Sequence, residues 1–268
     1  MTFSSITVAQ MIDVDRLMVE DYGILLLQMM EDAGRGLAEV ARYLLGGDVA
    51  GRKVVVLVGR GNNGGGGLVA ARHLANAAAE VTVALATAPD ALGDVPEHQR
   101  VTLAKMGVAG SDHVSEPGAL PRLIEGADLL LDALIGYRLH GAPREPIASF
   151  IHAANAVPAP RLALDLPSGL DGDRGVPLAP TLRADATLTL AWPKAGLLTK
   201  AARPFVGKLL LADISVPAGA YRAVGVDPGM LFARGPIVRV RPVANGWDPE
   251  PLASECPSAG MVVRLVPS

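Results

Sequence analysis

The hydrophobic positions at the start of the chain follow a helical period. In residues 6–20, apolar side chains recur near the spacing of one helical face, while charged side chains occupy the other positions. Val8, Met11, Ile12 and Met18 lie near this helical spacing. A second helix is predicted over about residues 26–45, where a pair of glycines ends it. Gly34 and Gly36 inside it weaken a helix, which predicts close packing against another backbone.

Beyond residue 50, the pattern changes to short runs that are apolar throughout. These runs are 54–58, 81–85, 129–131, 162–166, 187–191 and 209–214, and a helical stretch is predicted over about residues 68–79. Helical or loop segments separate the other runs. Strands that are apolar on both faces and alternate with helices are typical of a parallel sheet that helices cover on both sides. We therefore predict an α/β domain over residues 1–217.

The last fifty residues have a different character. Residues 218–268 are rich in Pro and Gly and carry only short apolar runs, at 237–240 and 261–266. They are too few for a second catalytic domain. We predict an irregular tail that contains a strand or two.

Composition excludes several classes of protein. The chain has 268 residues, of which 50% are hydrophobic and 19% are charged, as in a globular protein. A net charge of −3 argues against direct nucleic-acid binding and against binding to a membrane surface. No run is long enough to span a bilayer, and residues 1–16 lack a signal-peptide core. The single cysteine, Cys256, predicts an inert thiol, and we expect a cytoplasmic protein.

A glycine-rich segment, residues 58–67, follows the first predicted strand and precedes a helix. Glycines allow backbone N–H groups to approach an anion, and a helix N-terminus favours negative charge, so a phosphate is a plausible ligand. The alternative is a tight strand-to-helix turn without a ligand. The segment formally matches the dinucleotide pattern, but the next strand ends Ala86-Thr87 without the acid that would hold a ribose. This disfavours a classical nicotinamide-dependent oxidoreductase.

Two aspartates follow apolar runs at the edge where an open parallel sheet binds its ligand. Asp132 and Asp165 come at the carboxyl ends of two predicted strands, and the glycine-rich segment leaves its strand at the same edge. Each aspartate alone is best explained as a turn or helix cap. Together with the two asparagines and a serine they form a set of hard oxygen donors, which favours a ligand site and a hard cation.

Six ordered motifs resemble the YjeF amino-terminal domain family, whose best-known members are NAD(P)H-hydrate epimerases. The resemblance covers about residues 8–217. The motifs are Met30-Glu31-Asp32-Ala33-Gly34, Gly61-Asn62-Asn63-Gly64-Gly65 with Ala71-Arg72-His73-Leu74, Asp132-Ala133-Leu134-Ile135-Gly136, Asp165-Leu166-Pro167-Ser168-Gly169, Pro193-Lys194-Ala195-Gly196 and Ala212-Asp213-Ile214.

This resemblance implies a fold, an activity and a site. The fold is a three-layer α/β/α Rossmann-like domain with a central, mostly parallel sheet, and the assembly is a homodimer. The activity is interconversion of the R and S forms of hydrated NADH or NADPH. A potassium ion would be bound by Asn63, Asp132 and Ser168. By position, the substrate residues would be Asn62, Asn63, Gly64, Gly65, Gly66, Gly136, Tyr137, Arg138, Leu139, His140, Gly141, Ala142 and Asp165.

The chain departs from the family pattern at two places. Gly66 stands where the family usually has Asp, which removes a carboxylate from the site. Gly136-Tyr137-Arg138 replaces the usual Gly-Thr-Gly, which adds bulk and a positive charge. A catalytically silent module that binds a ligand or a protein is therefore the alternative to an active epimerase.

The chemistry of the expected reaction assigns roles to two residues. Asp165 is the candidate acid–base group for departure and return of water at C6 of the substrate. Lys194 is either an electrostatic helper in the substrate site or a solvated surface lysine. The dehydratase domain that often accompanies this family is not recognisable in the sequence, so we expect a separate protein to supply that step.

Overall fold

The fold was analysed in a computed structural model of the chain. The structure describes residues 3–112, 118–244 and 246–252. Cys256, His113 and the apolar run at 261–266 lie outside the described residues. No helix in the described part has both the length and the apolar character needed to cross a membrane.

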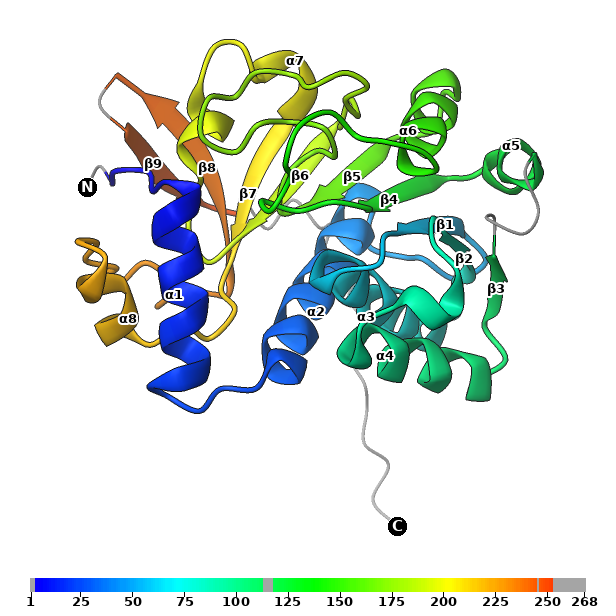
Figure 1. Cartoon of the computed structure of the whole chain (residues 1–268), viewed down its shortest axis with the longest axis horizontal. Coiled ribbons are helices and arrows are strands. Elements are labelled where there is room, and N and C mark those ends of the chain that lie inside the picture. The colour runs from blue at the N-terminus through cyan, green and yellow to red at the C-terminus, as the bar shows by residue number, and fades with distance from the viewer. Residues whose placement is uncertain (1–2, 113–117, 245, 253–268) are drawn as a thin grey trace, which may run out of the picture.

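One twisted sheet forms the centre of the molecule (Figure 1). Its order within the described residues is β3-β2-β1-β4-β5-β6-β7-β8-β9. Neighbouring strands from β3 through β7 are parallel, and β8 and β9 add an antiparallel edge. The strands are β1 (Lys53–Val58), β2 (Glu80–Leu85), β3 (Ala109–Asp112), β4 (Leu129–Ala133), β5 (Arg161–Leu164), β6 (Ala186–Leu190), β7 (Lys208–Ala212), β8 (Ile237–Val243) and β9 (Gly246–Pro251).

Helices cover both faces of the sheet, as the continuous apolar runs predict. Val54, Val56 and Val58 of β1 pack into the core cluster under α2 and α3. Val55 and Leu57 point the other way, into the cluster under α5 and α6. The helices are α1 (Val8–Glu20), α2 (Leu26–Leu44), α3 (Asn62–Asn76), α4 (Asp94–Lys105), α5 (Ala119–Ile124), α6 (Ile147–Ala156), α7 (Arg203–Val206) and α8 (Ala218–Ala223), with short 3₁₀ turns at Pro89–Ala91 and Ala195–Leu198.

The chain reverses direction across the sheet between β1 and β4. From β1 the chain proceeds outward to β2 and β3, then returns to β4 on the other side of β1 and continues to β7. Such a reversal leaves a crevice at the carboxyl ends of the central strands, because the connections on its two sides diverge. The predicted three-layer, mostly parallel fold is confirmed, and the crevice is where the predicted site residues lie.

The segment after residue 217 is more regular than its sequence indicates. The strands β8 and β9 extend the central sheet, with β8 pairing to β7. Trp247 of β9 is fully buried and packs on Phe3 and Trp192. Pairing with β7 orders a segment that has weak local signals, while residues 224–236 contain no helix or strand. The strands expected within it are present as β8 and β9.

Candidate active site

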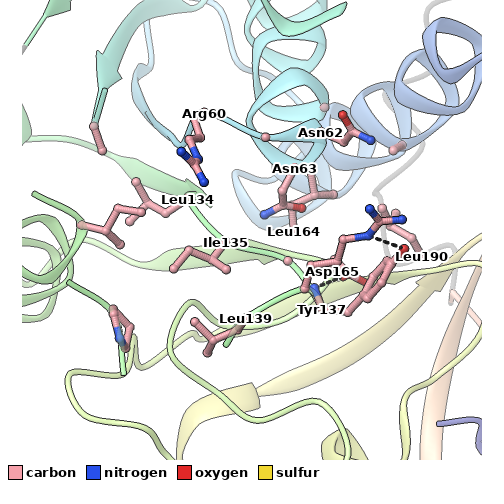
Figure 2. Close-up of a pocket in the computed structure, with 18 of the residues that line it drawn as sticks. Arg60, Asn62, Asn63, Leu134, Ile135, Tyr137, Leu139, Leu164, Asp165 and Leu190 are labelled. Atoms are coloured by element: carbon pink, nitrogen blue, oxygen red, sulfur yellow. Dashed lines mark hydrogen bonds between the residues drawn. The ribbon is translucent and has the colours of Figure 1, made fainter. Parts of the chain in front are cut away.

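A cavity of about 930 Å³ opens at the carboxyl ends of β1, β4 and β5. Figure 2 shows the side chains of Asn63, Tyr137 and Asp165 gathered in it. Most predicted substrate residues line this cavity. They are Asn62, Asn63, Gly66, Gly136, Tyr137, Arg138, Leu139, His140, Ala142, Asp165 and Lys194. Gly64, Gly65 and Gly141 are not among the residues that line it.

The glycine-rich segment is the start of a helix and not an open loop. The helix α3 begins at Asn62, and Gly65 N donates to Gly61 O at 3.2 Å. A Cβ on Gly64 would lie 2.0 Å from Gly59 O, and one on Gly65 would lie 2.4 Å from Met30 Sδ. These glycines allow close packing, so the prediction that α3 starts near residue 68 is wrong. The helix N-terminus still faces the cavity through Gly61, Asn62 and Asn63.

Asp165 and Lys194 form a buried ion pair at the cavity. Lys194 Nζ lies 2.5 Å from Asp165 Oδ1 and also donates to Leu190 O at 2.9 Å. Their side chains are only 1% and 4% exposed. The alternative of a solvated surface lysine is therefore wrong. Ile6 pairs with Lys194 as an isolated bridge, which brings the N-terminal segment alongside it.

The backbone holds Asp165 in an unusual conformation. Its φ is +68°, in the left-handed region that non-glycine residues rarely occupy. Asp165 N donates to Leu188 O at 2.7 Å, and Asp165 Oδ2 accepts from Tyr137 N at 2.9 Å. Local strain of this kind persists where surrounding contacts enforce it, and it is concentrated at functional sites.

Asp132 and Ser168 lie together behind the cavity wall. Ser168 donates to Asp132 through Oγ at 2.7 Å and through its backbone N at 2.8 Å. Leu134 N also donates to Asp132, at 3.2 Å, so this aspartate makes the turn contact that was the alternative to a ligand site. Burial raises the pKa of Asp132 to about 6, although these hydrogen bonds act to lower it. The hydrogen bonds between Asp132 and Ser168 join the end of β4 to the Pro-Ser-Gly segment that follows β5.

Asn63 completes the group of predicted polar residues. Its Oδ1 would lie 3.3 Å from a Cβ on Gly136, and Asp165 Oδ2 would lie 3.0 Å from the same point. Gly136 therefore allows the asparagine, the turn after β4 and Asp165 to meet. The Asn63 Nδ2 atom is buried and has no hydrogen-bond partner within the described residues.

Tyr137 connects the site to a residue that the sequence reasoning missed. Its hydroxyl donates a hydrogen bond to Asp15 Oδ2, and Arg138 Nε donates to the Tyr137 hydroxyl at 3.3 Å. Asp15 belongs to α1 and lines the cavity together with Met11, one helical turn before it. Their spacing of four residues was the available signal, but nothing in the sequence tells which face of α1 meets the cavity.

Cationic side chains lie at the cavity rim. Arg60, Arg138 and Arg144 line the cavity and are exposed to solvent. Figure 2 shows Arg60 beside the asparagine segment. Arg60 and Arg144 were not singled out from the sequence, because isolated surface arginines carry no positional signal. The rim is positive in a chain whose net charge is −3.

The fold is a Rossmann-like α/β domain with a cavity at the carboxyl ends of its strands. Residues 26–196 match the family described as YjeF-related protein N-terminus. The chain belongs to this family.

Relatives of the chain carry related names. It is 44% identical to the NAD(P)H-hydrate epimerase of Dehalogenimonas lykanthroporepellens, over 88% of this chain and 92% of that protein. It is 37% identical to a bifunctional NAD(P)H-hydrate repair enzyme of Salinibacter ruber, where the match covers 84% of this chain and 43% of that protein. The crystal structure of yeast ynu0 superposes with a TM-score of 0.77, at 22% identity, over 88% of this chain and 99% of that one, which supports the fold.

Proposed function

We propose that this protein is an NAD(P)H-hydrate epimerase, an isomerase of hydrated NADH and NADPH. The convergence of the motif segments on one cavity carries the proposal. Asn63, the turn at Gly136, Asp165 and Lys194 all line it, although they lie far apart in the sequence. A relative with this activity in its name matches over nearly its whole length.

The buried ion pair provides the reacting group. The substrate carries a hydroxyl on C6, next to the ring nitrogen, whose lone pair forms a C=N bond as the C–O bond breaks. Asp165 accepts or donates the proton that accompanies departure and return of water, and a positioned group of this kind accelerates a reaction about 10²–10⁴-fold. Lys194 neutralises the carboxylate and fixes its orientation through the 2.5 Å contact.

The rim suits the phosphorylated part of the substrate. The diphosphate lies at the N-terminus of α3, where unpaired backbone N–H groups favour anions. Arg60, Arg138 and Arg144 lie around the cavity and supply charged donors for phosphate oxygens. A volume of about 930 Å³ is at the upper end of the range for small-molecule and cofactor sites.

The residues that the resemblance assigns to potassium offer oxygen donors of the kind that such an ion binds. Asp132 and Ser168 supply a carboxylate and a hydroxyl that are already in contact at 2.7 Å. The buried Asn63 amide has an unpartnered nitrogen, and rotating the amide by half a turn would present its oxygen there. When bound, the ion would supply a fixed positive charge beside the buried carboxylate. Asn63, Asp132 and Ser168 would hold it and thereby hold three segments of the site together.

A homodimer is part of the proposal, and exposed apolar side chains support it. They lie on α1, on the connection to α2 and at the start of α2, and a contact with a second copy would bury them. These side chains are Ile12, Val19, Tyr22, Leu25, Leu26 and Leu27. We place the protein in the cytoplasm, together with a separate dehydratase that completes repair of the hydrated nucleotide.

A silent binding module is the second candidate, because Gly66 lacks the usual carboxylate. One experiment separates the two. Purified R-NADHX is incubated with and without the protein, and the epimers are resolved by chiral chromatography. An epimerase brings the mixture to equilibrium faster than the spontaneous rate. If the two time courses coincide, the proposal is wrong and the silent module remains.

A further inference from the structure

The first helix brings a second carboxyl group into the cavity. Asp15 of α1 lines the same space as Asp165, and the Tyr137 hydroxyl donates a hydrogen bond to its Oδ2. Asp15 belongs to none of the motifs described above. Its side chain points into the protein, whereas its neighbour Asp13 on the same helix is exposed.

Charged and titratable groups from three other segments face Asp15. They are Tyr137 and Arg138 from the turn after β4, Asp165 at the end of β5 and Lys194 after β6. Burial raises the pKa of Asp15, and the negative charge of Asp165 raises it further. The Tyr137 hydrogen bond, Lys194 and Arg138 act to lower this pKa. On balance, Asp15 holds a proton more readily than a free aspartate does.

Asp165 lies in a different environment. It accepts hydrogen bonds from Lys194 Nζ at 2.5 Å and from Tyr137 N at 2.9 Å, so both of its oxygens serve as acceptors. Among the described residues, the direct donor to Asp15 is the neutral hydroxyl of Tyr137. One carboxyl group is held by a charged donor and the other by a neutral hydroxyl, so the two are placed for different roles in proton transfer.

We propose that Asp15 is a second catalytic residue of the epimerase, acting on the face of the substrate ring opposite to Asp165. This inference rests on the proposed function. Epimerisation requires water to leave one face of C6 and to return to the other. Two carboxyl groups, one from α1 and one from the end of β5, give each face its own proton carrier.

The protons and electrons of the proposed step balance. Protonated Asp15 donates its proton to the C6 hydroxyl, and the C–O bond breaks to release water while the ring nitrogen lone pair forms the C=N bond. A water molecule then attacks C6 from the opposite face, the C=N electrons return to nitrogen, and Asp165 takes the proton of that water. The enzyme finishes with the proton on Asp165, which is the state needed for the reverse conversion.

The departures from the family pattern agree with this assignment. Gly66 carries no carboxylate into the cavity, and Asp15 brings one there from α1. Tyr137, which replaces the usual Thr, is long enough to reach Asp15 on α1. Both unusual positions line the same cavity.

The test compares three variants of the full chain with the wild type. Asp15→Asn keeps the size and removes the proton, so kcat should fall about 10²–10⁴-fold. In the wild type, kcat should fall as the pH rises through the pKa of Asp15, which gives the pH profile a descending limb. The Asp15→Asn variant should lose this limb. Tyr137→Phe removes a hydrogen bond that lowers this pKa, so the limb should move to higher pH. Asp13→Asn, on the exposed face of the same helix, should match the wild type.

The outcomes separate this inference from the proposed function. A wild type without activity overturns both. An active wild type whose kcat and pH limb survive Asp15→Asn overturns only the role of Asp15. If Asp15 merely positions Tyr137, Asp15→Asn and Tyr137→Phe will lower kcat equally and leave the limb in place. Should Asp15→Asn fail to fold, an unmoved limb in Tyr137→Phe refutes the assignment.

Discussion

At the scale of single residues, the site depends on an ion pair with almost no access to water. Burying a charged lysine and a charged aspartate costs free energy that their attraction offsets only when the geometry is good. The pair of Lys194 and Asp165 meets this condition, because both groups have further hydrogen bonds to Leu190 O and Tyr137 N. Removing either partner would leave a buried charge and cost about 3–5 kcal/mol. A buried pair at a cavity with a strained backbone is better explained by function than by stability.

Gly66 gives a second prediction at this scale. Its φ is not in the left-handed region, so an aspartate meets no backbone strain there. A Cβ would lie 2.8 Å from Leu164 Cδ2, the flexible end of a side chain that can move aside. We expect Gly66→Asp to fold with a loss of about 1–3 kcal/mol, as for other overpacked sites. We expect its epimerase rate to rise, because the substitution restores a carboxylate to the cavity.

The measurement combines thermal unfolding with the epimerisation rate. Gly110→Ala is a suitable control, because its Cβ would meet nothing within 4 Å. A lower rate in Gly66→Asp, with the fold intact, would contradict the idea that the missing carboxylate limits this enzyme.

At the scale of elements, α2 packs very closely against α3 near the site. A Cβ on Gly34 of α2 would lie 2.4 Å from Val69 Cβ and 2.5 Å from Gly66 O. The expectation that Gly34 allows close packing against another backbone is confirmed. We predict that Gly34→Ala forces the helices apart and destabilises the protein by about 1–3 kcal/mol or more, since backbone atoms cannot move aside.

Because α3 carries Asn62 and Asn63, the displacement of α3 in Gly34→Ala should also weaken substrate binding. The prediction is checked by chemical unfolding and by KM, and the same Gly110→Ala variant is the control. Unchanged stability and KM would show that the helices are not held at this distance.

The sequence predicted the sheet well and the helices around the site less well. Apolar runs locate β1, β2, β4, β5, β6 and β7, because a strand buried on both faces is apolar at most of its positions. The start of α3 was missed because four successive glycines, Gly64 to Gly67, have low helix propensity. Tertiary packing overrides that propensity. Asp15 was missed because the contact between α1 and Tyr137 spans 122 positions in the chain.

At the scale of the whole molecule, a bound cation would couple three segments of the site. Asn63, Asp132 and Ser168 come from α3, β4 and the segment after β5, and burial raises the pKa of Asp132 to about 6. We predict that potassium stabilises the folded protein relative to tetramethylammonium at equal ionic strength. At about 100 times the dissociation constant the gain is about 2.7 kcal/mol, which corresponds to a rise in Tm of about 5–10 °C.

Differential scanning calorimetry in the two salts measures this gain. Ser168→Ala removes one donor and should reduce the potassium-dependent part of Tm. Equal Tm values in the two salts for the wild type would contradict a potassium site.

The central claim is that this cavity epimerises hydrated nicotinamide nucleotides through Asp165. The most direct test follows one pure epimer by chiral chromatography with wild-type protein and with Asp165→Asn, at a temperature where circular dichroism shows both to be folded. We predict that the wild type reaches equilibrium well before the spontaneous control, while Asp165→Asn binds the substrate in calorimetry but is about 10²–10⁴-fold slower. A wild type that is clearly active and an Asp165→Asn variant of equal rate would contradict the assignment of Asp165.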